Sequence, residues 1–169
     1  MSALSGLAER QRGSAQYREK RRVTRVSTPT ADEIERFVID HFRAKSECDR
    51  QALLEQFAPD VRVWTPLSLT NRNFVERPTV GAERMADLIA SEFFYTKAGR
   101  AWTVEDWVSD GVKLAVRASL KAIIAATGEP YENSYTFFYR LDGLRIAESW
   151  EAFDTAFAAD RVQPQHDSI

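Results

Sequence analysis

The feature that most constrains the fold of this chain is a long run, residues 112–124, in which apolar and polar side chains mostly alternate. A period of two places alternate side chains on opposite faces of an extended strand. The run therefore predicts a long amphipathic strand with one wholly apolar face. That face consists of Val112, Leu114, Val116, Ala118, Leu120, Ala122 and Ile124.

Turn signals on both sides of this strand predict a meander of antiparallel strands. Asp110-Gly111 and Asp142-Gly143 are typical hairpin turns, and Thr127-Gly128 also turns the chain back. The stretches WTVEDWVS and YENSYTFFYRL read as further strands. In the second of these, one face is predicted to carry Asn133, Tyr135, Phe137 and Tyr139.

The first half of the chain has helical spacing instead. Thr30 and Glu33 form a capping-box pattern, which predicts a helix over about 31–45. A shorter helix is expected over about 49–58, followed by a strand in DVRVWTP. Apolar residues of the first helix lie at helical spacing. They are Ile34, Phe37, Val38, His41 and Phe42.

Residues 67–80 look like a loop, and Gly81 is expected to open a third helix. Its predicted apolar stripe is Met85, Leu88, Ile89 and Phe93, and only strands are expected after it. Three helices followed by a meander of strands indicate an α+β fold. We expect a strongly curved, mainly antiparallel sheet that forms a cone-shaped cavity with the three N-terminal helices.

Charge divides the chain unevenly. Residues 1–29 carry seven Lys/Arg and two Glu, so this arm is basic (+5), whereas the remainder is acidic because the whole chain has a net charge of −2. The arm has little aromatic content for stacking on bases, so we expect a flexible extension, or one that packs on a partner subunit of an oligomer, rather than a segment that binds nucleic acid. The expected organisation is a basic arm (1–29), one domain (30–160) and a C-terminal tail (161–169).

Composition narrows the compartment and the chemistry. The single cysteine, Cys48, excludes an internal disulfide and fits a reducing compartment. No apolar run is long enough to span a membrane, and no secretory signal is recognisable, so we expect a cytoplasmic protein. With only two histidines and no Gly-rich phosphate loop, we expect neither a metal nor a cofactor.

The last predicted strand, AESWEAFD, contains a carboxylate among aromatic residues. Alternation alone places Ile146 and Trp150 on the more apolar face, which leaves Glu151 on the other face and exposed to water. A pocket that holds Glu151 is the other possibility. In that case the Ile146 and Trp150 face would contact the second subunit of a homodimer.

Several segments resemble the SnoaL-like branch of the nuclear transport factor 2-like superfamily. They are LLEQFAPDVRVWTP, GAERMADLI and YENSYTFFYRLDGLRIAESWEAFDT, and the resemblance covers about residues 31–160. It implies the cone-shaped fold, but this superfamily includes isomerases, cyclases, hydrolases, dehydratases and binding proteins.

The resemblance also implies that Glu151 points into the pocket. Ketosteroid isomerases have an Asp that acts as the base on the first strand and a second, protonated Asp. This chain has Thr65 and Phe137 at these two positions, so it lacks the base of that mechanism. Limonene-epoxide hydrolases use an Arg and an Asp on the long middle strand and an Asp on the last strand. At the first two positions this chain has Ala118 and Leu120, and at the third it keeps a carboxylate, Glu151. Phenazine-biosynthesis condensation proteins carry a catalytic Glu at this position and are also similar in YENSY and in having an arm.

Two hypotheses of function follow. The first is a cofactor-independent cyclase, isomerase or dehydratase that acts on a hydrophobic ring compound by general acid–base catalysis. Glu151 is its candidate acid–base with His41 assisting, although His41 also fits a core histidine. The second is a non-catalytic ligand-binding or scaffold protein that uses the same cavity. The expected substrate-binding residues are Asn133, Tyr135, Phe137, Val63, Thr65, Ala118, Leu120 and Phe153. The tryptophans Trp64, Trp102 and Trp107 are expected in the core or the dimer contact.

Overall fold

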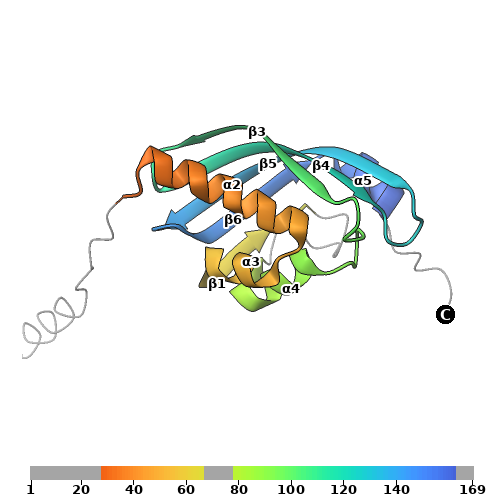
Figure 1. Cartoon of the computed structure of the whole chain (residues 1–169), viewed down its shortest axis with the longest axis horizontal. Coiled ribbons are helices and arrows are strands. Elements are labelled where there is room, and N and C mark those ends of the chain that lie inside the picture. The colour runs from red at the N-terminus through yellow and green to blue at the C-terminus, as the bar shows by residue number, and fades with distance from the viewer. Residues whose placement is uncertain (1–27, 67–77, 163–169) are drawn as a thin grey trace, which may run out of the picture.

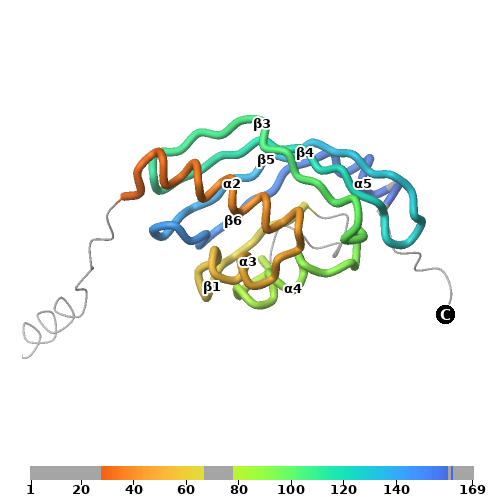
Figure 2. Tube along the Cα trace, in the orientation of Figure 1, coloured from red at the N-terminus to blue at the C-terminus, as the bar shows by residue number. Residues whose placement is uncertain are grey.

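The computed structural model describes residues 28–66 and 78–162, which form a mixed α+β domain. Nearly all of the predicted basic arm, and most of the predicted tail, lie outside the described residues. In Figures 1 and 2, helix α2 (Ala31–Glu47) runs along one side of the sheet, and helices α3 (Arg50–Gln56) and α4 (Ala82–Ala90) lie together beside strand β1 (Phe57–Trp64). The predicted α+β architecture is confirmed.

Helix α2 begins with the predicted capping box. The Thr30 hydroxyl accepts a hydrogen bond from the Glu33 backbone N–H at 3.3 Å, and the Glu33 carboxylate accepts one from the Thr30 N–H at 2.8 Å. Two of the N–H groups that a helix start leaves unpaired are thereby satisfied. The apolar stripe of α2 is buried, and the helix ends at Cys48, which adopts a left-handed conformation.

The second and third helices are shorter than expected. Helix α3 ends at Gln56 because Phe57 begins β1, so the predicted extension to residue 58 is wrong. Helix α4 ends at Ala90, and Phe93 lies beyond it with 63% of its surface exposed. Phe93 therefore does not belong to the buried stripe of this helix, contrary to the prediction.

The sheet has six strands in the order β2-β1-β6-β5-β4-β3. The strands other than β1 are β2 (Thr79–Val80), β3 (Ala101–Ser109), β4 (Lys113–Ile123), β5 (Pro130–Asp142) and β6 (Arg145–Phe153). Neighbouring strands are antiparallel except for β1 and β6, which are parallel. The residues predicted as a loop include β2 at their end, and positions 67–77 lie outside the described residues.

The predicted amphipathic strand and its turns are confirmed, except that Val112 lies before β4 with 48% of its surface exposed and so does not belong to the buried face, contrary to the prediction. On β4, the apolar side chains from Leu114 to Ala122 are buried and face the helices, where they form the core with the inner face of β5. Gly111, Gly128 and Gly143 all have positive φ in the three predicted turns. Glycine adopts this conformation without the steric cost that a side chain adds.

A bulge in β6 changes which residues share a face. Leu141 pairs with Ile146 whereas Arg140 pairs with Glu148, so Ala147 is an extra residue on this strand. Ile146 and Ser149 both point inward and are 0% and 3% exposed. The prediction that Ile146 shares an outward face with Trp150 is therefore wrong, because simple alternation does not survive a bulge.

The outer face of the sheet carries an apolar row. Phe138 on β5 pairs in register with Trp150 on β6, and these side chains are 55% and 40% exposed. The rings of Trp150 and Trp64 stack with their centroids 4.8 Å apart. Trp64 is thus a residue of this outer face.

The prediction that only strands follow helix α4 is wrong. Helix α5 (Thr155–Val162) follows β6, and the buried Ala158 joins the core. Among the described residues, no helix is long and apolar enough to cross a membrane.

Candidate active site

A cavity of about 130 Å³ lies between the inner face of the sheet, the end of α2 and helix α4. Its walls are mainly apolar and aromatic, and a few polar side chains face it, as is usual for pockets that bind small molecules. The lining residues are Lys45, Thr65, Met85, Leu88, Ile89, Ser91, Phe94, Tyr95, Arg100, Trp102, Leu120, Tyr135, Phe137, Glu151 and Phe153.

Glu151 is the carboxylate of this cavity. It lies on β6 directly opposite Phe137 of β5, and its next inward neighbour on the strand is Phe153. Burial of the carboxylate raises the pKa of Glu151, and the positive charge of Lys45 opposes that rise. Of the two placements that the sequence left open, the structure has the one in which Glu151 faces the pocket.

Lys45, on the last turn of α2, brings an amine to the wall of the cavity. Its side chain is only 5% exposed. The ammonium nitrogen lies 3.9 Å from the ring centroid of Phe137, 4.4 Å from that of Trp102 and 5.2 Å from that of Phe42. Burial lowers the pKa of Lys45 to about 8, against the opposing effect of the Glu151 charge.

Sequence reasoning missed Lys45, although a signal was present. Lys45 follows His41 by four residues and therefore continues the apolar stripe of α2. A lysine on a buried helical stripe either extends its head group to solvent or needs a special environment. Here the surrounding aromatic rings and the cavity provide that environment.

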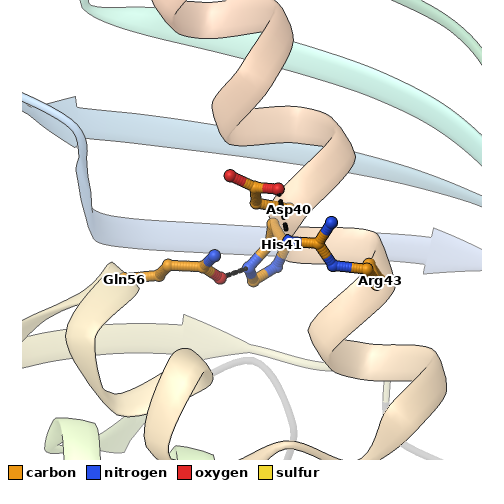
Figure 3. A network of polar contacts seen from close by, with 4 residues as sticks. All are labelled: Asp40, His41, Arg43 and Gln56. Atoms are coloured by element: carbon orange, nitrogen blue, oxygen red, sulfur yellow. Dashed lines mark hydrogen bonds and ion pairs between the residues drawn. The ribbon is translucent and has the colours of Figure 1, made fainter.

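His41, the predicted assistant of Glu151, lies in the core and is not among the residues that line the cavity. Its ring is 2% exposed and packs against four aromatic rings, those of Phe37, Phe42, Phe57 and Tyr139. Its Nδ1 atom forms a hydrogen bond of 2.8 Å with Oε1 of Gln56 (Figure 3).

Burial and the nearby Lys45 charge lower the pKa of His41 to about 3, so the ring is neutral at physiological pH. Figure 3 also shows its neighbours Asp40 and Arg43, which pair with each other rather than with the imidazole. The structure thus brings Glu151 together with Lys45, not with His41. A neutral, enclosed imidazole that already has a hydrogen-bond partner fits a packing role.

Asn133 supports the cavity wall from behind. Its amide nitrogen donates to the Tyr131 hydroxyl at 2.8 Å and to the Asp154 carbonyl at 3.1 Å. The Tyr131 hydroxyl lies 3.1 Å from that of Tyr135, which does line the cavity. Asn133 therefore positions the tyrosines and does not itself reach the pocket, contrary to its predicted contact with substrate.

The hydroxyl of Tyr95 completes this polar end of the cavity. It is buried and has no hydrogen-bond partner among the described residues. Burial raises the pKa of both Tyr95 and Tyr135 above the ordinary value, so both phenols stay protonated. A buried hydroxyl without a partner is costly unless a ligand or water satisfies it.

The other predicted substrate-binding residues divide into two groups. Thr65, Leu120, Phe137 and Phe153 line the cavity, as the sequence indicated. Val63 and Ala118 are buried in the core and are not among the lining residues, contrary to the prediction. Trp102 lines the cavity as well as packing in the core, which the sequence did not indicate.

Arg100 has a structural task at the edge of the cavity. Its guanidinium donates to the carbonyl oxygens of Ile89 at 2.7 Å and Ser91 at 2.9 Å, and also to that of Tyr95. These carbonyls belong to the end of α4 and the turn after it. Arg100 thereby holds the segment that carries Ser91, Phe94 and Tyr95 against the pocket.

A second hollow, of about 820 Å³, lies on the surface between α3, β2 and α4. Charged side chains such as Glu55, Glu83, Arg84 and Asp87 line much of it. It lacks a buried polar group aimed into an apolar enclosure. The smaller cavity with Glu151 and Lys45 is therefore the better candidate for chemistry. No cluster of metal-ligating side chains occurs among the residues described here.

Comparison with known proteins agrees with this architecture. The model of the SnoaL-like domain family matches residues 34–149. A comparison with curated protein sequences found no match.

Solved structures with the same fold include TsrD from Streptomyces laurentii, at 18% identity over 79% of this chain and 97% of that chain, with a TM-score of 0.62. IdmH, a putative polyketide cyclase from Streptomyces antibioticus, has 22% identity over 75% and 96%, with a TM-score of 0.60. A protein with a ketosteroid isomerase-like fold from Catenulispora acidiphila, solved with trimethylamine, has 14% identity over 79% and 97%, with a TM-score of 0.62.

These identities establish a common fold and leave the chemistry to the individual site. The similarity to phenazine-biosynthesis proteins stays a prediction. The family match, which spans most of the chain, and the shared fold lead to one conclusion: this chain belongs to the SnoaL-like domain family.

Proposed function

We propose that this protein is a cofactor-independent enzyme that transfers protons on a small ring-containing molecule, with Glu151 as the general acid–base. The observation that carries the proposal is the Glu151 carboxylate on the wall of a mainly apolar cavity. Burial raises the pKa of Glu151 above its ordinary value, which is the direction that suits a carboxyl group for general acid–base catalysis.

The volume of the cavity limits the size of the ligand. A cavity of about 150 Å³ lined by apolar side chains holds one benzene molecule. The cavity here, of about 130 Å³, therefore fits a single ring or a fragment of similar size. Larger substrates would place one ring inside and the remainder toward the opening.

The phenols of Tyr95 and Tyr135 add hydrogen-bond donors at one end of the cavity. A protonated phenol can donate to a carbonyl or hydroxyl oxygen of the ligand. A ring ketone oriented in this way presents its α-hydrogens to the rest of the pocket. Isomerisation, cyclisation and dehydration of such compounds all begin with transfer of a proton of this kind.

A test that needs no knowledge of the natural substrate is hydrogen–deuterium exchange of single-ring ketones in D₂O, followed by NMR. The protein is expected to accelerate exchange at the carbon next to the carbonyl group. Glu151→Gln keeps the shape and hydrogen bonding of the side chain but removes proton transfer, so it should slow the exchange by about 10²–10⁴. Ligand binding, measured by thermal shift, should survive.

Glu148→Gln is the matched control because Glu148 lies on the same strand and pairs with Arg140 at 2.9 Å on the outer face. This variant should exchange at the wild-type rate. Equal rates in wild type and Glu151→Gln would contradict the proposal.

The second candidate function is a non-catalytic binder, which the apolar character of most of the lining favours. In that case hydrophobic ring compounds raise the melting temperature without any accelerated exchange. We expect nucleotides and divalent metals to leave the melting temperature unchanged under either reading. Stabilisation by these compounds alone would argue against both.

A further inference from the structure

Lys45 has features that packing alone does not explain. A buried lysine normally pairs with a carboxylate, because an unpaired charge in a protein interior is costly. The described residues give Lys45 neither an ion pair within 4.0 Å nor a hydrogen bond. Its amine instead lies over three aromatic rings at the wall of the cavity.

We propose that Lys45 is a nucleophile that forms an imine with aldehydes and ketones that enter this cavity. The inference goes beyond the proposed function, since it assigns a covalent step to a second residue and names carbonyl compounds as the ligand class. An amine in a mainly apolar pocket that also holds a carboxyl group able to transfer protons is an arrangement that suits imine formation.

The step balances without a cofactor. The lone pair of neutral Nζ attacks the carbonyl carbon, a C–N bond forms, and the carbonyl oxygen takes a proton to give a carbinolamine. The C–O bond then breaks, oxygen leaves as water with a second proton, and a C=N bond remains. The sum is amine plus carbonyl giving imine plus water, and hydrolysis reverses it.

Glu151 is the group in the cavity suited to move these protons. Its charge interacts with that of Lys45, and both side chains line the same space. The protonated carboxyl can donate to the departing oxygen, and the carboxylate can take the proton released by nitrogen.

The rings around Lys45 suit each state of the nitrogen. With a pKa of about 8, roughly a tenth of Lys45 is neutral at pH 7, far more than for an ordinary lysine. A protonated imine is again a cation, so the faces of Phe137 and Trp102 stabilise it as they stabilise the ammonium. The apolar walls limit the access of water that would hydrolyse it.

The test is reductive trapping on the full-length protein. Cyclohexanone, benzaldehyde or butanal is added with sodium cyanoborohydride at pH 7, and the product is measured by intact mass and peptide mapping. Hydride adds to the imine carbon and gives a stable secondary amine. Among the lysines, the expected result is one adduct on Lys45, with the mass of the carbonyl compound less one oxygen, formed about ten-fold or more faster than adducts on exposed lysines. The N-terminal α-amino group, whose ordinary pKa is also about 8, reacts as well, and the peptide map separates it from Lys45.

Two lysine variants make the result specific. Lys45→Met should abolish the fast adduct, whereas Lys121→Met, which removes an exposed lysine, should leave it unchanged. Absence of a Lys45 adduct with all three probes, or an equal rate on exposed lysines, overturns the proposal. A fast adduct on any lysine of Lys45→Met overturns it as well.

Glu151→Gln separates this inference from the proposed function. Trapping at Lys45 that is slower in this variant supports the shared role of the two residues. If trapping at Lys45 persists while ketone exchange is the same with and without Glu151, the imine site stands and the general acid–base role of Glu151 fails.

Discussion

Replacing Lys45 by methionine is expected to stabilise the folded protein at neutral pH, although the lysine contacts three aromatic rings. The pKa of Lys45 falls from its ordinary value of 10.5 to about 8 on folding. Keeping the Lys45 ammonium charged therefore destabilises the folded state by about 3 kcal/mol. The cation–π contacts favour the charged form and are already contained in this shift, so replacing the lysine by an uncharged methionine should gain up to about 3 kcal/mol.

The sign of the pH dependence follows from the same values. Between pH 8 and 10.5 the unfolded chain binds more protons at Lys45 than the folded chain, so wild-type stability rises with pH in this window. Lys45→Met lacks this dependence. The advantage of the variant should therefore shrink by about 1 kcal/mol between pH 7 and pH 9.

Urea unfolding followed by far-UV circular dichroism at pH 7, 8 and 9 measures the difference. Lys121→Met is the control, because the Lys121 side chain is 68% exposed and pairs with Glu132 at 3.5 Å on the surface. It should change stability by less than about 0.5 kcal/mol at every pH. A Lys45→Met variant that is less stable than wild type at pH 7, or equally different at pH 7 and 9, refutes the reasoning. If replacement of Lys45 stabilises the folded protein, the lysine behaves as a residue that is retained for function although it lowers stability.

Three further predictions concern the core, the pocket edge and the outer face. The free energy of unfolding of the wild type should fall by about 4–5 kcal/mol as pH falls from 6.5 toward 3, because the buried His41 resists protonation, and His41→Asn should lack this fall. An NMR titration in which the His41 imidazole takes up its proton near pH 6.5 would rule this out. Arg100→Gln should lower the free energy of unfolding in urea by about 3 kcal/mol, because it removes charged donors from three carbonyl oxygens. The control Arg117→Gln breaks an exposed ion pair and should cost less than about 1 kcal/mol. Similar costs for the two variants would argue against a role of Arg100 in holding the segment after α4. We predict a homodimer through the apolar outer face, so Phe138→Glu should convert dimer to monomer in light scattering without loss of secondary structure; a wild-type monomer at micromolar concentration would exclude it.

The sequence determined those features that depend on neighbours along the chain. The alternation in β4 has a single apolar face, so its orientation follows directly once the strand forms. The capping box at Thr30 and Glu33 and the glycines of the three turns act within a few residues. For these elements local backbone chemistry and side-chain period are sufficient, and the prediction was confirmed.

The last strand shows where local reasoning ends. Both faces of β6 contain apolar residues, so alternation could not decide which face Glu151 shares with the core. The bulge at Ala147 then placed Ile146 and Ser149 on the same side. A bulge depends on pairing with the neighbouring strand, and the sequence of β6 alone carries no clear sign of it.

The chemistry of the site was decided by the tertiary structure. Lys45, Trp102, Phe137 and Glu151 come from α2, β3, β5 and β6, and only folding brings them to one cavity. His41 is on the same helix as Lys45, yet it faces closed packing while Lys45 faces the pocket. The pKa of each group depends on how much water the surrounding elements remove and on which charges lie near, and both are properties of the assembled fold, not of the order of residues.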